Sequence, residues 1–252
     1  MKAIYRFLKL IFLFALFFVA ISVIGYLLVK AKLLSVNQYF LPANPTIGVD
    51  VSEYQGEIDM STLAQQVKFI YIKATEGSNY QDPNFKQNWS GANSTSLAVG
   101  AYHFFSFDSP GDTQARNFIN TVGQLDSNHL IPAVDIEYYA DKKSNPPDKT
   151  TVVSELKTFL ATLEAEYHVK PLLYSGRDIY QRYLQDDFQD YPRWGSNLYV
   201  PIYLDFAQNW TIWQYSDRGT LDGYSGDQQY IDLNVINPST SLDQLKLSHH
   251  QK

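Results

Sequence analysis

The feature that most constrains the fold is an alternation, over residues 46–175, of short β-rich runs with stretches that can form amphipathic helices. The clearest helix is Thr151–Tyr167, whose apolar residues recur at helical spacing on one face. Parallel strands need long crossover connections, usually helical, so this alternation predicts a parallel sheet that curls into a barrel. The five predicted strands are Thr46–Val51, Phe69–Ala74, Ala98–Phe105, Leu130–Glu137 and Pro171–Ser175.

The last third of the chain departs from this rhythm. Asn197–Leu204, Trp210–Tyr215 and Tyr230–Val235 resemble strands, but the gaps between them are short and rich in Gly, Asp and Asn. Such gaps leave no room for a crossover helix. We therefore expect an α/β, TIM-like barrel of five β/α units that closes with three further strands joined as β-hairpins.

The N-terminus contains one long apolar segment. Residues Phe7–Val29 are almost wholly apolar, broken only by Lys9. A segment of this length can cross a bilayer as a single transmembrane helix. Slightly more basic residues precede the apolar segment than follow it. This favours an N-terminus inside the cell and the rest of the chain outside. A cleaved signal peptide, followed by secretion, is the alternative, but its apolar core usually spans about 7–15 residues. We favour an uncleaved, single-pass anchor in the cell membrane.

These patterns divide the chain into four parts. Residues 1–32 form the anchor or signal segment, and residues 33–45, with two prolines and no clear period, form a linker. Residues 46–237 form the barrel, and residues 238–252 form a C-terminal tail without an appended wall-binding module. We expect a monomer.

Charge and cysteine content exclude several classes of function. The chain has no cysteine, which excludes disulfides, thiolate nucleophiles and zinc–thiolate sites. Residues 1–32 hold five basic groups and no acid, so the remainder carries 15 basic and 26 acidic groups. A domain this acidic is a poor candidate for binding nucleic acid through phosphate neutralisation. A neutral or mixed-charge polymer is the expected partner.

Two carboxylates end the fourth predicted strand. Asp135 and Glu137 are two residues apart, so a strand would project both from one face, roughly 6–7 Å apart. Paired carboxylates of this kind perform acid catalysis on glycosidic bonds. Functional residues of a barrel cluster where its strands end, and other acidic and aromatic residues fall there too. The acids Glu137, Asp135, Asp50 and Asp232 are therefore expected to ring one mouth of the barrel, with Tyr102, Tyr174, Trp213, Tyr54 and Gln55 as candidate substrate contacts.

Other chemistries find little support in the sequence. A zinc-dependent deacetylase would need clustered histidines, but His103, His129 and His168 lie far apart in the chain. No Gly-x-Ser-x-Gly motif supports a serine nucleophile. We therefore predict no metal and no cofactor. His103 is expected to be a buried hydrogen-bonding residue, and Lys73 and Glu76 to form an ion pair that shapes the mouth.

A series of motifs, in this order along residues 45–237, resembles glycoside hydrolase family 25, the lysozymes of the Chalaropsis type. The resemblance implies a (β/α)5(β)3 barrel and hydrolysis of the β-1,4 bond between N-acetylmuramic acid and N-acetylglucosamine in peptidoglycan. It also implies that Glu137 is the general acid and that Asp135, Asp50 and Asp232 are the other acidic residues of the site. The motifs are Gly48–Ser52 (GVDVS), Phe69–Gly77 (FIYIKATEG), Gly100–Phe104 (GAYHF), Pro132–Glu137 (PAVDIE), Leu173–Gly176 (LYSG), Trp213–Ser216 (WQYS) and Asp232–Asn234 (DLN).

The role of Asp135 stays open at this point. A direct nucleophile would lie about 5–5.5 Å from the acid and an inverting base about 6.5–9.5 Å, and an i, i+2 pair falls between these ranges. In a third mechanism the N-acetyl oxygen of the substrate attacks the anomeric carbon while Asp135 orients it, and the resemblance to family 25 favours this one. Crowding by like charges is expected to raise the pKa of Glu137, as a general acid requires. The rival function is a catalytically silent, peptidoglycan-binding scaffold with the same barrel.

Overall fold

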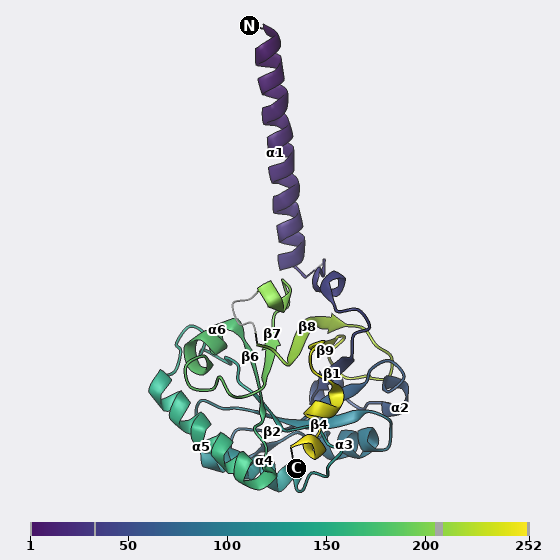
Figure 1. Ribbon diagram of the computed structural model, residues 1–252, viewed down its shortest axis with the longest axis vertical. Helices are drawn as coiled ribbons and strands as arrows, with labels where there is room; N and C mark the ends of the chain where they lie inside the picture. The colour runs from purple at the N-terminus through teal and green to yellow at the C-terminus, as the bar shows by residue number, and fades with distance from the viewer. Residues whose placement is uncertain (1, 33, 205–208, 251–252) are drawn as a thin grey trace.

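The computed structural model describes residues 2–32, 34–204 and 209–250. Helix α1 (Lys2–Lys30) projects away from the rest of the chain, which folds into a barrel with helices on its outside (Figure 1). The Ile4–Lys30 segment of this helix is long and apolar enough to cross a membrane, and none of its most apolar window is buried against the barrel.

Eight strands close the barrel, as predicted. Strand β1 pairs with both β9 and β2, and the remaining neighbours complete the ring in the order β1-β9-β8-β7-β6-β5-β4-β2. Every neighbouring pair is parallel except β8 with β9 and β9 with β1, which are antiparallel. A short β3 (Tyr80–Gln81) pairs with the end of β2. The barrel strands are β1 (Ile47–Val51), β2 (Phe69–Glu76), β4 (Ala98–Phe104), β5 (Ala133–Asp135), β6 (Leu172–Gly176), β7 (Arg193–Ser196), β8 (Ile212–Gly219) and β9 (Ile231–Ile236).

Helices in the connections cover the outside of the barrel. They are α2 (Met60–Leu63), α3 (Phe85–Asn93), α4 (Gly111–Val122), α5 (Lys149–Tyr167) and α6 (Arg177–Ile179), followed by a π-helical turn over Tyr180–Leu184. The predicted helix Thr151–Tyr167 is confirmed as α5, which begins two residues earlier because Asp148 caps it by accepting a bond from the Thr151 amide. Helices α4 and α5 approach closely at Gly111, where a Cβ atom would lie 2.0 Å from the Glu155 carbonyl oxygen.

Large aromatic side chains fill the barrel interior. Phe69 and Tyr71 project inward from β2 and are fully buried, and the Tyr71 ring lies 4.9 Å from the ring of Trp194 on β7. The Tyr71 ring presses against Gly100 on β4, where a Cβ atom would come within 2.3 Å of it. These rings close the barrel beneath its mouth, so polar groups collect only at the strand ends.

The sixth barrel strand corrects the sequence prediction. It is β7 (Arg193–Ser196), whereas the predicted strand Asn197–Leu204 contains a 3-10 helix at Ile202–Leu204 instead. With the strand ending at Ser196, about fifteen residues separate β7 from β8, enough for a crossover. The β7–β8 pair is accordingly parallel, and the expected hairpin closure holds only for β8 with β9.

Both segments that flank the barrel in sequence pack against it. A 3-10 helix at Asn37–Phe40 lies in the predicted linker, and the buried Asn37 amide donates to the carbonyls of Asn197 and Tyr215, at 2.8 and 3.0 Å. In the predicted tail, Leu245 and Leu247 are buried at the end of the barrel opposite α1 (Figure 1).

Candidate active site

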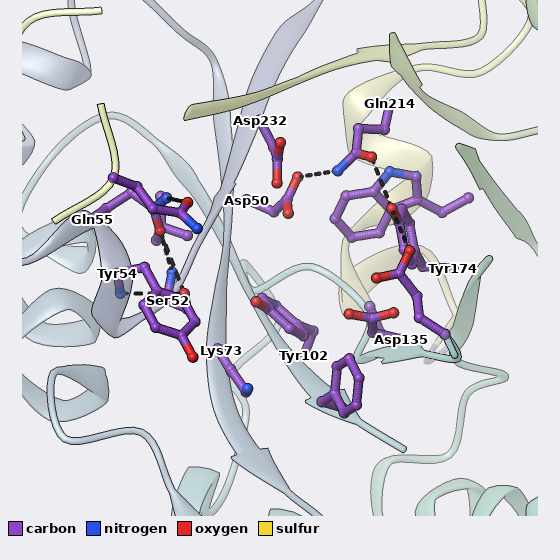
Figure 2. A pocket seen from close by; sticks show the side chains of 16 residues that line it. Asp50, Ser52, Tyr54, Gln55, Lys73, Tyr102, Asp135, Tyr174, Gln214 and Asp232 are labelled. Atoms are coloured by element: carbon purple, nitrogen blue, oxygen red, sulfur yellow. Dashed lines mark hydrogen bonds between the residues drawn. The ribbon is translucent and has the colours of Figure 1, made fainter. Parts of the chain in front are cut away.

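A pocket of about 190 Å³ opens where the strands end (Figure 2). It is smaller than typical sites for drug-sized ligands, roughly 300–1,000 Å³, and so suits one sugar ring held tightly. Every barrel strand contributes to its lining or borders it. The lining residues are Asp50, Val51, Ser52, Tyr54, Gln55, Lys73, Tyr102, Phe104, Ala133, Asp135, Glu137, Tyr174, Trp194, Gln214, Gln228 and Asp232.

Two of the four acidic residues face each other across neighbouring strands. Asp50 on β1 and Asp232 on β9 are directly opposite in the antiparallel register, which brings their carboxyl groups together (Figure 2). Burial raises the pKa of Asp232 to about 9, and the nearby charge of Asp50 adds to the effect. Burial also raises the pKa of Asp50. A protonated Asp232 that donates to an ionised Asp50 satisfies both groups.

Asp50 is held by two amide side chains. Its Oδ1 atom accepts a bond of 2.6 Å from the Asn234 amide and one of 3.3 Å from the Gln214 amide. Asn234 is oriented in turn by the Trp194 indole, which donates to its Oδ1 atom at 2.8 Å. Because all these residues come from adjacent strands β7, β8 and β9, the barrel itself fixes the position of the Asp50 carboxylate.

Glu137 lies two residues beyond the end of β5, against Tyr174 of the neighbouring β6. The Tyr174 hydroxyl donates to Gln214 Oε1 at 2.8 Å and lies 3.3 Å from Glu137 Oε1. Burial is the main cause that raises the pKa of Glu137, and the Asp50 charge raises it further against the opposing effect of the Tyr174 hydrogen bond. The pKa of Glu137 is thus raised, in the direction expected from the sequence, although burial outweighs like-charge repulsion as the cause.

Asp135 is the most isolated of the four carboxyl groups. Its Oδ1 atom is buried and has no hydrogen-bond partner among the described residues. Burial, followed by the charges of Glu137 and Asp50, raises its pKa well above the ordinary value, while Lys73 acts in the opposite direction. A buried acceptor without a partner is costly unless a ligand satisfies it, so this atom is arranged to receive a donor.

Tyrosine and glutamine side chains form the remaining walls. Tyr102 lines the pocket, and Tyr54 is exposed at the rim. The Gln55 amide donates to Gln228 Oε1 at 2.8 Å, and the Gln228 backbone amide donates to the Tyr54 carbonyl at 3.1 Å. The loop before β9 thus braces the rim formed after β1.

Trp213 is the predicted contact that the structure does not bring into the pocket. It is buried on the other side of β8, where its ring packs 6.3 Å from that of Trp210 and 5.9 Å from that of Tyr215. Its indole donates to the Asn197 carbonyl at 3.0 Å. Side chains alternate along a strand, so Gln214, the next residue, faces the pocket in its place. The expectation that Trp213 contacts substrate is therefore corrected.

A second hollow, of about 430 Å³, adjoins the pocket at Glu137. It is open, and tyrosine and charged side chains line it, among them Tyr138, Lys143, Arg177 and Tyr199. Glu137 lines both spaces. The carboxyl group therefore stands at the boundary between the pocket and this second hollow, which we call the groove.

Several lining residues were not predicted from the sequence, whereas three supporting residues were. Gln228 and Trp194 were overlooked because the first lies in an irregular loop and the second in the unrecognised strand β7. The predicted Lys73–Glu76 ion pair is confirmed at 2.7 Å. His103 is fully buried between Thr75 and Gln114, and burial lowers its pKa to about 3, which confirms it as a hydrogen-bonding core residue.

An eight-stranded mixed barrel with paired carboxyl groups at its mouth is an arrangement that glycoside hydrolases of the α/β-barrel class use. Residues 49–224 match the model of glycosyl hydrolases family 25, and the chain belongs to that family.

Relatives and solved structures agree with this assignment. The chain is 35% identical over 205 residues to the uncharacterized protein YegX of Escherichia coli K12, covering 78% of this chain and 72% of YegX. It is 31% identical over 207 residues to lysozyme M1 of Streptomyces globisporus, and the match covers 77% of this chain and 68% of lysozyme M1. A family 25 glycosyl hydrolase from Bacillus anthracis superposes with a TM-score of 0.72 at 44% identity, covering 79% of this chain and 90% of the other.

Proposed function

We propose that the chain is an N-acetylmuramidase, which hydrolyses the β-1,4 bond between N-acetylmuramic acid and N-acetylglucosamine in peptidoglycan. Membership of family 25 and the name of lysozyme M1 support the substrate class. The observation that carries the proposal is the position of Glu137, a carboxyl group with a raised pKa at the boundary between pocket and groove.

Glu137 acts as the general acid. Cleavage of a glycosidic bond requires a proton on the leaving oxygen, and a carboxyl group that stays protonated near neutral pH can supply it. The Tyr174 hydroxyl lies beside Glu137 and holds its orientation. Because the acid protonates the bridging oxygen, the scissile bond lies at Glu137 itself, with one sugar in the pocket and the next in the groove.

The pocket holds the muramic acid ring, and Asp135 assists from its floor. The partnerless Oδ1 atom of Asp135 can accept the N–H of the substrate N-acetyl group, which aims the acetyl oxygen at the anomeric carbon. This arrangement favours the substrate-assisted mechanism over direct attack by the carboxylate. Attack by the acetyl oxygen forms its bond to the anomeric carbon as the bond to the leaving oxygen breaks, and water later opens the cyclic intermediate.

Asp50 and Asp232 position the same sugar and stabilise developing positive charge. Asp50 is fixed by Asn234 and Gln214, so an ionised Asp50 would present a preorganised negative charge to the oxocarbenium-like transition state. Tyr102 offers its hydroxyl to the same sugar, and Tyr54 and Gln55 contact it from the rim.

A peptidoglycan substrate places the barrel outside the cytoplasm. The N-terminal apolar helix is a candidate signal anchor or signal peptide. We propose that it remains uncleaved and holds a monomeric enzyme in the cell membrane. The appearance in the culture medium of mature protein beginning near Lys32 would contradict this anchoring.

The acid role predicts a specific loss in the Glu137→Gln variant. An amide cannot protonate the leaving oxygen, so we expect the release of new reducing ends from purified peptidoglycan to fall by about 10²–10⁴-fold. The matched control is Glu166→Gln, an identical change at an exposed position of α5, which should leave the rate unchanged.

The same assay separates the enzyme from a silent scaffold of the same fold. Binding of the Glu137→Gln protein to peptidoglycan should persist while cleavage is lost. If the wild-type protein binds several wall types but releases reducing ends from none, the chain is a scaffold and the proposed activity is wrong.

A further inference from the structure

Exposed apolar side chains of the barrel region gather beside the end of α1. Outside α1, nine large apolar residues of the described chain are exposed, and seven of them lie in two short segments, residues 34–40 and 199–204. Such concentration marks an interaction surface, since singly scattered residues need no partner. We call these seven the anchor-side patch: Leu34, Tyr39, Phe40, Tyr199, Val200, Tyr203 and Leu204.

The two segments form one surface although about 160 residues separate them. Asn37 donates to the carbonyl of Asn197, which directly ties the first segment to the start of the second. Beneath them, Leu41 packs on a buried cluster that contains Ile202 and Trp213. Figure 1 shows both 3-10 helices, Asn37–Phe40 and Ile202–Leu204, beside the lower end of α1.

Contacts with the barrel begin directly after the end of helix α1. Lys32 forms an ion pair with Asp217 of β8, and the Arg218 side chain donates to the Lys32 carbonyl at 3.3 Å. The backbone amide of Leu34 donates to the carbonyl of Leu28 within α1, at 3.2 Å. The end of the helix is thus fastened to the barrel at the patch.

Helix length sets the depth of the patch in a membrane. The uncharged, mostly apolar run Leu10–Val29 has 20 residues. As an α-helix it spans about 30 Å, the thickness of the hydrocarbon layer. Lys9 and Lys30 then lie at the two interfaces. The patch begins four residues after Lys30, so it falls at the level of the lipid headgroups.

We propose that the barrel docks on the outer surface of the phospholipid bilayer through the anchor-side patch. Three of its residues are tyrosines and one is a phenylalanine, the amphipathic and aromatic side chains that concentrate at membrane interfaces. Lys30 places a positive charge at the same level for the lipid phosphates. The occupant of the patch is therefore the membrane that holds α1.

Docking determines which glycan the site can reach, and this consequence rests on the proposed muramidase function. Tyr199 belongs to the patch and also lines the open groove beside Glu137. The leaving-group side of the site then opens along the membrane surface. The enzyme preferentially cuts glycan strands that lie against the membrane, such as those still attached to it by a lipid.

Single-cysteine labelling tests the docking without any substrate. The chain contains no cysteine, so Tyr39→Cys, Tyr203→Cys and Ser127→Cys each give one thiol for a fluorophore in the full chain, reconstituted at one copy per nanodisc. Ser127 is exposed ahead of β5, at the opposite end of the barrel. We expect lipids with a spin label near the headgroup to quench labels at positions 39 and 203 at least threefold more than a label at 127.

Equal quenching at the three positions would overturn the docking. The labels at 39 and 203 could instead escape lipid quenching at one copy per nanodisc and become shielded only when two copies are present. That result would assign the patch to a protein dimer and would also overturn the docking.

A second measurement tests the consequence for substrate. The double variant Tyr39→Ser/Leu204→Ser should cut lipid-attached glycan in the same membrane at least threefold more slowly, with an unchanged rate on soluble glycan fragments. An equal rate on both substrates would overturn the membrane preference. If the wild-type protein cleaves neither substrate, that result would instead contradict the proposed function.

Discussion

Four carboxyl groups lie in one small pocket, and burial raises the pKa of each of them. The clearest case is Asp232, whose pKa burial raises to about 9 beside Asp50. A raised folded-state pKa means that the protonated form favours folding. This contribution is fully present below the unfolded pKa near 3.8 and is lost as the pH rises through the folded value.

An Asp232→Asn variant should reverse that loss. The amide stays neutral and can still donate to Asp50, so we expect its melting temperature to exceed that of the wild type at pH 8 and the difference to shrink towards pH 4. Thermal unfolding of the detergent-solubilised chain at several pH values measures this. The exposed Asp227→Asn serves as the control for loss of a surface charge. A difference that stays constant with pH would contradict the protonation of Asp232.

The substrate-assisted role of Asp135 has its own test at this scale. If the acetyl oxygen is the nucleophile, glycan whose muramic acid has lost its N-acetyl group should be cut at least ~100-fold more slowly while still binding. Product analysis on matched acetylated and deacetylated glycan gives the ratio. Equal rates on the two would make Asp135 a direct nucleophile or a base.

At the residue scale, the sequence located the acids but not every wall of the pocket. Asp50, Asp135 and Asp232 lie on strands β1, β5 and β9, whereas Glu137 lies beyond β5, which is shorter than the predicted strand Leu130–Glu137. For Trp213 the sequence could not distinguish the inner from the outer face of β8, because both it and Gln214 are plausible mouth residues. Which of the two faces inward depends on the register with β7 and β9.

At the scale of elements, the elements with strong apolar periodicity were predicted correctly, whereas short strands were not. Helix α5 and strands β1, β2 and β4 are close to their predicted bounds, because their apolar patterns are long. Strand β7 has only four residues and contains Arg193 and Gly195, so nothing in its composition marks a strand. This segment becomes a strand because it pairs with β6 and β8, which is a tertiary effect.

The C-terminal segment shows the same dependence on tertiary contacts. Residues 242–249 form two 3-10 helices, and the backbone amides of Ile131 and Leu247 donate to the carbonyls of Leu245 and His129, at 2.8 and 2.9 Å. Only two leucines of this polar segment are buried, too few to give a periodic signal. The segment closes the floor of the barrel.

Truncation of one of these leucines should destabilise the barrel. Leu247→Ala creates a cavity beneath β5, and we expect the free energy of unfolding to fall by about 2–5 kcal/mol. Urea denaturation followed by tryptophan fluorescence measures the change, with the exposed Ser248→Ala as the control. If Leu247→Ala unfolds at the same urea concentration as the control, the segment does not support the barrel.

At the scale of the whole molecule, an apolar N-terminal helix and a barrel with a small pocket at its mouth make up a peptidoglycan hydrolase of family 25. The barrel class followed from the alternation of strands and helices, and family motifs carried the function. The packing of residues 37–41 against β8 was not predictable, because that segment has no regular pattern and is held by single contacts such as those of Asn37.

The central claim is that this barrel cuts the bond on the reducing side of N-acetylmuramic acid. Mass spectrometry of the fragments that the full chain releases from purified peptidoglycan, after reduction of their ends with borodeuteride, tests it directly. We expect fragments that end in deuterium-labelled muramitol, and these should be absent from digests by Glu137→Gln. Fragments that end in labelled glucosaminitol would show cleavage of the other glycosidic bond and contradict it.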